Sequence, residues 1–128
     1  MTADSPDMTN VQRALIVVSR RRLYYDQGVD RFGVDDLDED WPFEIDQQAS
    51  HLFKHPGLGL GDIGDVWTSE PLFYPAKPPA HWLMVAEVSG RILTVPLAPS
   101  NTGDRRRCRP IGCYVAADHL ARRYREDR

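Results

Sequence analysis

The sequence has few of the residues that build disulfide-rich or zinc-stabilised folds. It contains two cysteines, too few for a disulfide framework or a site with four cysteine ligands. Apolar runs are short: one of the longest, residues 14–18, falls far below the roughly 20 residues of a membrane-spanning helix. The N-terminus carries Asp4 and Asp7 where a signal peptide would carry basic residues. We therefore expect a cytoplasmic protein with no membrane segment.

Charge is distributed unevenly along the chain. Residues 1–50 carry a net charge of −6 and residues 101–128 carry +4, although the whole chain carries only −3. An arginine-rich end attracts phosphate groups, and an acidic end repels them. The pattern therefore predicts a dipolar molecule whose C-terminal end is suited to an anionic partner.

The first half of the chain predicts helices and one short strand. Apolar residues from Val11 to Val29 fall at helical spacing and favour an N-terminal helix, whereas the β-branched residues 16–18 favour a strand. Residues 34–40 indicate an acidic loop, and residues 41–46 alternate as a strand does. Helices are expected at 46–55 and 60–69, the second with its apolar face formed by Leu60, Ile63, Val66 and Trp67.

The second half predicts an antiparallel sheet. A strand at 72–74 is followed by a hairpin, whose strands 81–88 and 91–97 are joined by a Ser-Gly turn. A last strand at 108–115 and an amphipathic helix at 116–125 complete the domain. This order indicates an α+β fold, with a small antiparallel sheet of about four strands and helices packed on one face. We expect residues 1–40 to form an N-terminal extension and residues 41–128 the α+β domain.

Several familiar motifs lack the context that their chemistry needs. Gly59, Gly61 and Gly64 spell G-x-G-x-x-G, but a helix end and not a strand precedes them, so a turn between helices is the better interpretation. Cys108 and Cys113 lie five apart on one expected strand, which would direct them to opposite faces and prevent a disulfide. The spacing of the histidines at 51 and 55 suits a metal only weakly, and no nucleophile elbow occurs. No cofactor is therefore expected.

Cationic and imidazole groups remain as the candidate functional set. Any one of them alone is best explained as a surface charge, but together, at strand starts and along one helix, they suit a phosphodiester. The set consists of Lys54, His55, His81, Arg91, Arg105, Arg106, Arg107, Arg109, Arg122 and Arg123.

From Phe43 onward, collinear motifs cover about 80 residues. These are F-E-I-D at 43–46, H-L-F-K-H at 51–55, H-W-L at 81–83, G-R-I-L-T-V at 90–95, R-P-I at 109–111 and the close of the chain at 116–124. In this order the chain resembles the BrnT-type toxins of the RelE-like ribonuclease superfamily, members of type II toxin-antitoxin systems. The resemblance implies the α+β fold, a cognate antitoxin as partner and RNA, free or on the ribosome, as substrate. It also implies that oligomers would form through the antitoxin.

The activity that the resemblance implies is metal-free RNA cleavage. The ribose 2′-hydroxyl would attack its own phosphate, leaving a 2′,3′-cyclic phosphate and a 5′-hydroxyl. Arg91 and Arg109 would clamp the phosphate, and Lys54 would stabilise charge or act as base. His55 is the alternative acid or base; as a residue at a helix C-terminus it is equally well explained by the helix dipole. His81 and Tyr114 are further candidates for the acid or base. The phosphates of the RNA backbone would be contacted by Arg105, Arg106, Arg107, Arg122 and Arg123.

A non-catalytic interaction domain on the same scaffold, binding protein or nucleic acid, is the alternative. It is favoured by the N-terminal segment and by His81, which stands where the family has arginine. The acidic N-terminal arm is a further hypothesis: it would shield the basic site within the chain or contribute to the antitoxin interface.

Overall fold

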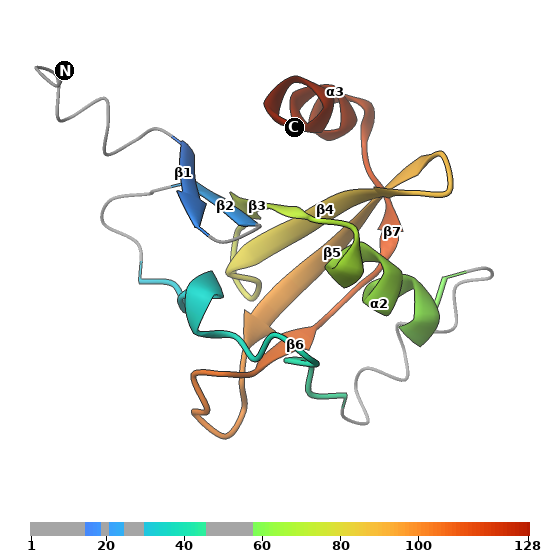
Figure 1. The fold of residues 1–128 in the computed structure, drawn as a ribbon. Coiled ribbons are helices and arrows are strands. Elements are labelled where there is room, and N and C mark those ends of the chain that lie inside the picture. Colours follow the sequence, from blue (N-terminus) through green and yellow to red (C-terminus); the bar gives the residue numbers. More distant parts are fainter. Residues whose placement is uncertain (1–14, 19–20, 25–29, 46–57) are drawn as a thin grey trace, which may run out of the picture.

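The computed structural model describes residues 15–18, 21–24, 30–45 and 58–128 (Figure 1). The elements are β1 (Leu15–Val18), β2 (Arg21–Tyr24), η1 (Val34–Asp36), α2 (Leu60–Thr68), β3 (Leu72–Pro75), β4 (Trp82–Val88), β5 (Arg91–Pro99), β6 (Cys108–Pro110), β7 (Tyr114–Val115) and α3 (Asp118–Asp127). The strands form one sheet in the order β1-β2-β3-β4-β5-β6, with β7 also paired to β5. The expected α+β class is confirmed. The helix expected at 46–55 lies outside the described residues.

Residues 15–18 and 21–24 of the N-terminal segment belong to the sheet. β1 and β2 pair as an antiparallel hairpin, and β2 pairs in parallel with β3. The helix favoured over this segment is therefore wrong for residues 15–18 and 21–24, where the β-branched run forms a strand as the alternative predicted. Farther along, Val34 and Leu37 are buried in the core, so the expected boundary at residue 40 does not separate two packing units.

The two described helices cover opposite faces of the sheet (Figure 1). On the face that we call the α2 face, Ile63, Val66 and Trp67 pack with Met84 and Leu93. Side chains alternate along a strand, so the residues next to Met84 on β4 and next to Leu93 on β5 point to the opposite face of the sheet. The prediction that the helices share one face is therefore wrong for α2 and α3.

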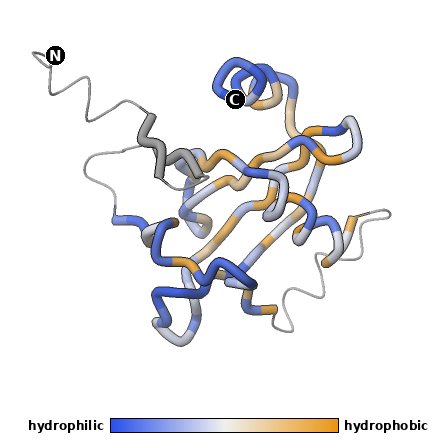
Figure 2. The backbone as a smooth tube through the Cα atoms, viewed as in Figure 1, coloured by the Kyte–Doolittle hydropathy of each residue, from blue (hydrophilic) through white to orange (hydrophobic). Residues whose placement is uncertain are grey.

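On the second face, which we call the α3 face, Ala121 and Tyr124 pack with Leu72, Val85 and Ile92. The central strands carry the most hydrophobic stretches, whereas α3 is largely hydrophilic outside its contact stripe (Figure 2). Burial on both sides explains why β4 and β5 are almost continuously apolar in sequence.

Helix α2 has the expected position, with one difference in its buried stripe. Ile63, Val66 and Trp67 are buried, but Leu60 is 44% exposed. The backbone N–H of Gly59 donates to the Asp62 carboxylate at 2.6 Å, which caps the first turn. The glycine motif therefore lies at and inside the start of α2. The residues before it, 46–57, lie outside the described ones, so the turn between two helices stays a prediction.

The last expected strand is interrupted. β6 and β7 both pair with β5, but the four-residue step from Leu97 to Leu93 on β5 faces a five-residue step from Pro110 to Val115. One extra residue is a β-bulge, and it reverses the alternation of side chains beyond it. Cys108 and Cys113 consequently share the α2 face, where both are buried and free. The predicted absence of a disulfide is confirmed, but the predicted opposite orientation is wrong.

Residues 41–45 form no strand of their own. Phe43 makes a single parallel bridge with Cys108, and the backbone N–H of Cys108 donates to Pro42 O at 2.8 Å. Trp41 and Trp67 both meet the Phe43 ring edge-on. The alternating pattern predicted a strand, and a bridge anchored by aromatic packing is what forms.

Candidate functional site

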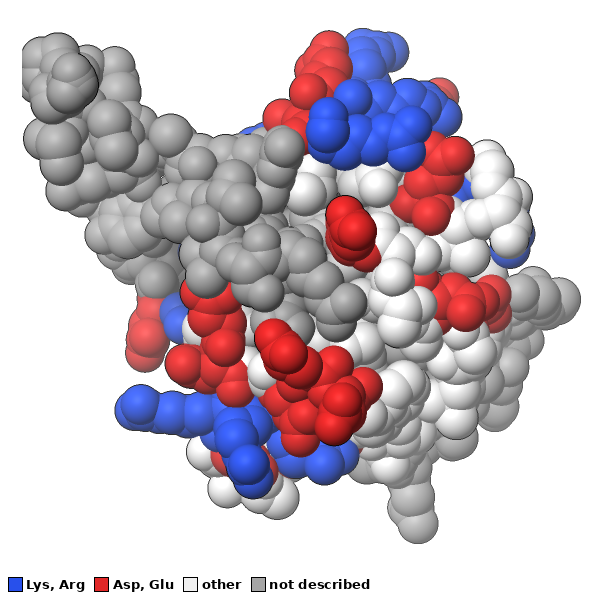
Figure 3. All heavy atoms as spheres, viewed as in Figure 1, with Lys and Arg blue, Asp and Glu red and all other residues white. Residues whose placement is uncertain are grey.

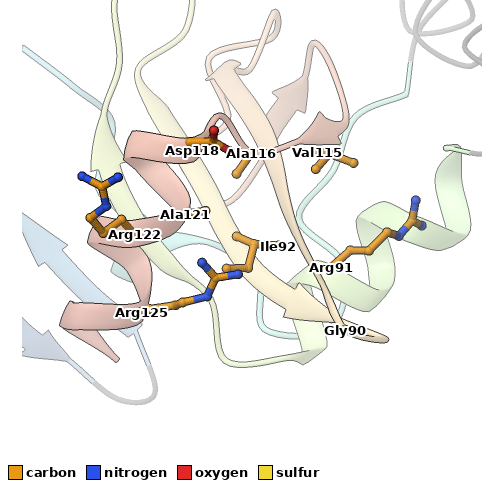
Figure 4. Close-up of a pocket in the computed structure, with 9 residues that line it drawn as sticks. All are labelled: Gly90, Arg91, Ile92, Val115, Ala116, Asp118, Ala121, Arg122 and Arg125. Carbon is orange, nitrogen blue, oxygen red and sulfur yellow. The ribbon is translucent and has the colours of Figure 1, made fainter.

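A cleft of about 460 Å³ opens between the β4–β5 turn, the end of β7 and helix α3. Its walls come from three segments distant in sequence: Gly90, Arg91 and Ile92; Val115, Ala116 and Asp118; and Ala121, Arg122 and Arg125 (Figure 4). The floor is apolar and the rim is cationic, an arrangement that suits an anionic ligand with a partly apolar body.

Helix periodicity sets the two arginines of α3 at this cleft. Ala121 and Tyr124 face the sheet. Arg122 and Arg125, each one residue later, therefore lie at the edge of this contact face, where they are exposed and line the cleft. Neither guanidinium has an ion pair or hydrogen bond within the part of the chain that the structure describes. In Figure 4 the Arg125 guanidinium lies towards Ile92, and that of Arg122 extends outward from the helix.

The other arginines of α3 are engaged. Arg123 pairs with Asp127 (3.8 Å) and lies over the Tyr74 ring, 5.0 Å from its centre. Arg128 donates to Glu87 at 2.6 Å. Arg123 was expected to contact RNA; the structure gives it an intramolecular partner, and the RNA contact stays a prediction.

Arg91 borders the cleft but does not point into it. It lies two residues before Leu93, so its side chain belongs to the α2 face. Figure 4 agrees, since Arg91 extends away from α3. The pKa of Cys113, on the same face, is raised by burial and then by Asp62 of α2, whereas Arg91 acts to lower it.

Arg91 and Arg109 do not meet. Arg109 pairs with Ala98, seven positions along β5 from Arg91, a separation of about 23 Å at 3.3 Å per residue. Ala98 also lies on the opposite face from Arg91, and the Arg109 Nε–H donates to Pro99 O at 2.9 Å. A phosphate clamp shared by these two arginines, expected from the sequence, therefore does not form.

The arginine loop at 105–107 lies beside acidic residues. Arg107 pairs with Glu44 at 3.6 Å and donates to Phe43 O, and Arg106 lies 3.8 Å from Asp104. The backbone N–H of Asp38 donates to Arg106 O at 2.9 Å, which holds the acidic segment 35–40 against this loop. Blue and red surfaces accordingly meet at the lower edge of Figure 3.

His81 is partly buried at the start of β4, at the other end of the sheet from the α3 cleft. Its Nδ1 accepts a hydrogen bond from the Phe32 N–H (3.0 Å), and its ring stacks on that of Phe32 with 5.3 Å between centres. Burial, and then the charge of Arg31, lower the pKa of His81, while Asp30 acts to raise it. A smaller cleft of about 390 Å³, also lined by Asp36 and Arg105, adjoins it.

Tyr114 pairs with Thr94 on the α3 face and is 45% exposed. Partial burial raises its pKa, which makes it a poor base at neutral pH. Cys113 is a poor nucleophile for the same reason, since burial and then Asp62 raise its pKa to about 11.

Lys54 and His55 lie outside the described residues, so their place relative to the cleft stays a prediction. Arg125 and Asp118 were missed as site residues. The signal for Arg125 was available, because it stands three residues after Arg122 and so shares its helix face.

Within the described residues, no three His, Cys, Asp or Glu side chains gather as a metal site would require, and no helix has the length and hydrophobicity needed to cross a bilayer.

Comparison with protein-family models, curated proteins and solved structures finds no match to this chain.

Proposed function

We propose that this domain binds the phosphate backbone of RNA in the cleft between β5 and α3. The observation that carries this is the pair Arg122 and Arg125, two exposed guanidiniums at one cleft that have no ion-pair partner among the described residues. Guanidinium groups bind phosphate bidentately. Little opposing charge lies at that position, since Asp118 is the only acidic residue lining the cleft among the residues that the structure describes.

Binding to a short single-stranded RNA at several salt concentrations tests the proposal. We expect Arg122→Gln with Arg125→Gln to weaken binding at least tenfold at low salt, and to reduce the slope of log K against log salt by about 1 to 2. The control replaces Arg105 and Arg106 with glutamine, which removes the same charge from the opposite end of the sheet. Equal losses in both variants would mean diffuse attraction, and would contradict a site at α3.

RNA cleavage is the second, narrower proposal. It is supported by one observation: two segments that carry the resemblance to BrnT-type toxins, 90–95 and 116–124, line the same cleft. The 2′-hydroxyl would attack the adjacent phosphate, with Arg122 and Arg125 taking the charge-stabilising place that Arg91 and Arg109 cannot share. Lys54 and His55 are the proposed proton-transfer groups.

The cleavage proposal is tested with purified protein, a defined RNA and no added metal, alone and with ribosomes. We expect 2′,3′-cyclic ends with the wild type, and at least a hundredfold slower cleavage with Lys54→Ala. Binding without cleavage in both settings would leave the non-catalytic interaction domain as the function. In the toxin interpretation a cognate antitoxin would cover this cleft in the cytoplasm, where buried cysteines such as Cys108 remain reduced.

A further inference from the structure

Residues 30–37, which we call the strap, cross the start of β4 and end in the core. Val34 and Leu37 are buried among the residues of the α2 face, and η1 shapes the turn between them. Beyond the strap, the acidic segment continues to Glu39, whose carbonyl accepts the Trp67 indole N–H at 3.1 Å. The strap is thus held by apolar burial at its end and by polar contacts at its beginning.

The polar contacts concentrate on two consecutive residues, His81 just before β4 and Trp82 at the start of the strand. The Phe32 N–H donates to His81 Nδ1 (3.0 Å), and the Trp82 indole N–H donates back to Phe32 O (2.9 Å). Arg31 donates through Nε to His81 O (2.9 Å) and lies over the Trp82 ring, 5.7 Å from its centre. Phe32 is therefore clasped through its N–H, its carbonyl and its ring.

We propose that His81 is a pH-sensitive clasp, and that protonation of its Nδ1 releases the beginning of the strap from β4. The chemistry follows from the direction of one hydrogen bond. Nδ1 accepts from a backbone N–H, so it must carry no proton while the clasp is closed. A proton on Nδ1 would set two N–H donors against each other at 3.0 Å, which the Phe32 contact cannot accommodate.

The charges around the imidazole come from the strap and from the arginine loop. Arg31 and Arg105 are cationic and oppose protonation, whereas Asp30 and Asp36 favour it. Burial adds to the opposition and lowers the pKa of His81 below its ordinary value of 6.5. The open state binds the proton more readily, so closure is complete above pH 6.5 and weakens as the pH falls below it.

Release would change the surface around the start of β4. The Phe32 ring would leave the His81 imidazole on which it stacks, and the partly buried Phe32 side chain would become accessible. Asp38 N–H still donates to Arg106 O, and Glu39 O still accepts from the Trp67 indole, so the acidic segment stays on the arginine loop. Acidification would thus uncover apolar surface at the beginning of the strap.

Nuclear magnetic resonance of the full chain tests the proposal, with the Phe32 amide and the Trp82 indole N–H as reporters of the clasp. We expect both signals to shift with one midpoint below pH 6.5, matching the titration of the His81 ring, and the Phe32 amide to lose its protection from hydrogen exchange at least tenfold. The Trp67 indole N–H, bonded to Glu39, is the reference at the other end.

His81→Asn is the diagnostic variant, because the Asn side-chain oxygen stands near the position of Nδ1 and accepts a hydrogen bond at every pH. It should abolish the transition, while the matched His119→Asn, at an exposed site on α3, should leave it unchanged. The same transition in His81→Asn would assign it to carboxylates and overturn the proposal. If that variant fails to fold, the wild type still decides: His81 titration without movement of the Phe32 amide would also overturn it.

Discussion

At the scale of single residues, Thr94 stands out because it is polar and completely buried in the centre of the sheet. Its neighbours across β4 and β7 are Val85 and Tyr114. The hydroxyl has no hydrogen-bond partner among the described residues. A buried hydroxyl without a partner destabilises the folded state, because it gives up its hydrogen bonds to water.

We therefore expect Thr94→Val, which keeps the branched shape, to raise the free energy of unfolding by about 1 kcal/mol. The comparison is Thr68→Val, whose hydroxyl donates to Gly64 O at 3.0 Å on the exposed side of α2. Denaturant unfolding measures both. A loss of stability in Thr94→Val would mean that the hydroxyl is satisfied, most simply by a buried water.

At the scale of elements, the β4–β5 hairpin shows how a local turn sets a long register. Ser89 and Gly90 both have positive φ, 52° and 82°, as the tight turns matched to strand twist require. The register that follows joins Val88 to Arg91 and continues to Trp82 and Leu97. The turn also positions Gly90 and Ile92 at the α3 cleft.

Two substitutions test how the positive φ angles of Gly90 and Ser89 contribute to the stability of the protein. Gly90→Ala should lower the free energy of unfolding by about 1 kcal/mol, because an L side chain is disfavoured at that φ. No other atom lies within 4 Å of the added methyl group, so the effect belongs to the backbone alone. Ser89→Asn should raise the melting temperature, because Asn tolerates positive φ better than Ser. Thermal unfolding checks both, and a destabilised Ser89→Asn would contradict the turn assignment.

At the scale of the whole molecule, the dipolar sequence does not become a simply dipolar surface. The acidic segment 35–40 lies on the arginine loop 105–107, so one basic cluster is compensated. The α3 cleft lies at the other end of the sheet, and its Arg122 and Arg125 are exposed. Basic side chains gather over α3 at the top of Figure 3. Acidic groups thus lie beside the loop arginines, which supports the shielding hypothesis for the loop, whereas Arg122 and Arg125 of α3 have no ion pair among the described residues.

Shielding predicts that removing acidic charge increases RNA affinity. Asp38→Asn with Asp40→Asn keeps the side-chain oxygen that accepts the Asp40 N–H, so the fold should survive. We expect a several-fold gain at low salt that disappears at high salt, where such charges are screened. Deleting residues 1–40 would be a poorer test, because it removes Val34 and Leu37 from the core.

The matched control for shielding is Asp65→Asn with Glu70→Gln, which removes the same charge from exposed positions at α2. Equal gains from the two pairs would reduce shielding to an effect of net charge. No gain from either pair would remove the hypothesis.

Local pattern alone determined much of this protein. The periodicities of α2 and α3 and the Ser-Gly turn are properties of short stretches, and the structure confirms them. The partition of the sheet into two buried faces was decided by the tertiary structure. So was the strand character of β1 and β2, because β2 pairs with β3, about fifty residues away, and β1 pairs with β2.

The candidate site follows the same division. Arginine spacing along α3 could be interpreted from sequence, because one helix face is set by its own period. Whether Arg91 and Arg109 meet depends on the faces of β5 and on the pairing of β6. The sequence pattern does not indicate the β-bulge after Pro110, which reverses the side-chain alternation of the residues that follow it. Strand pairing is a contact between distant residues, so composition and periodicity place residues on elements, and only the packed sheet decides which of them face each other.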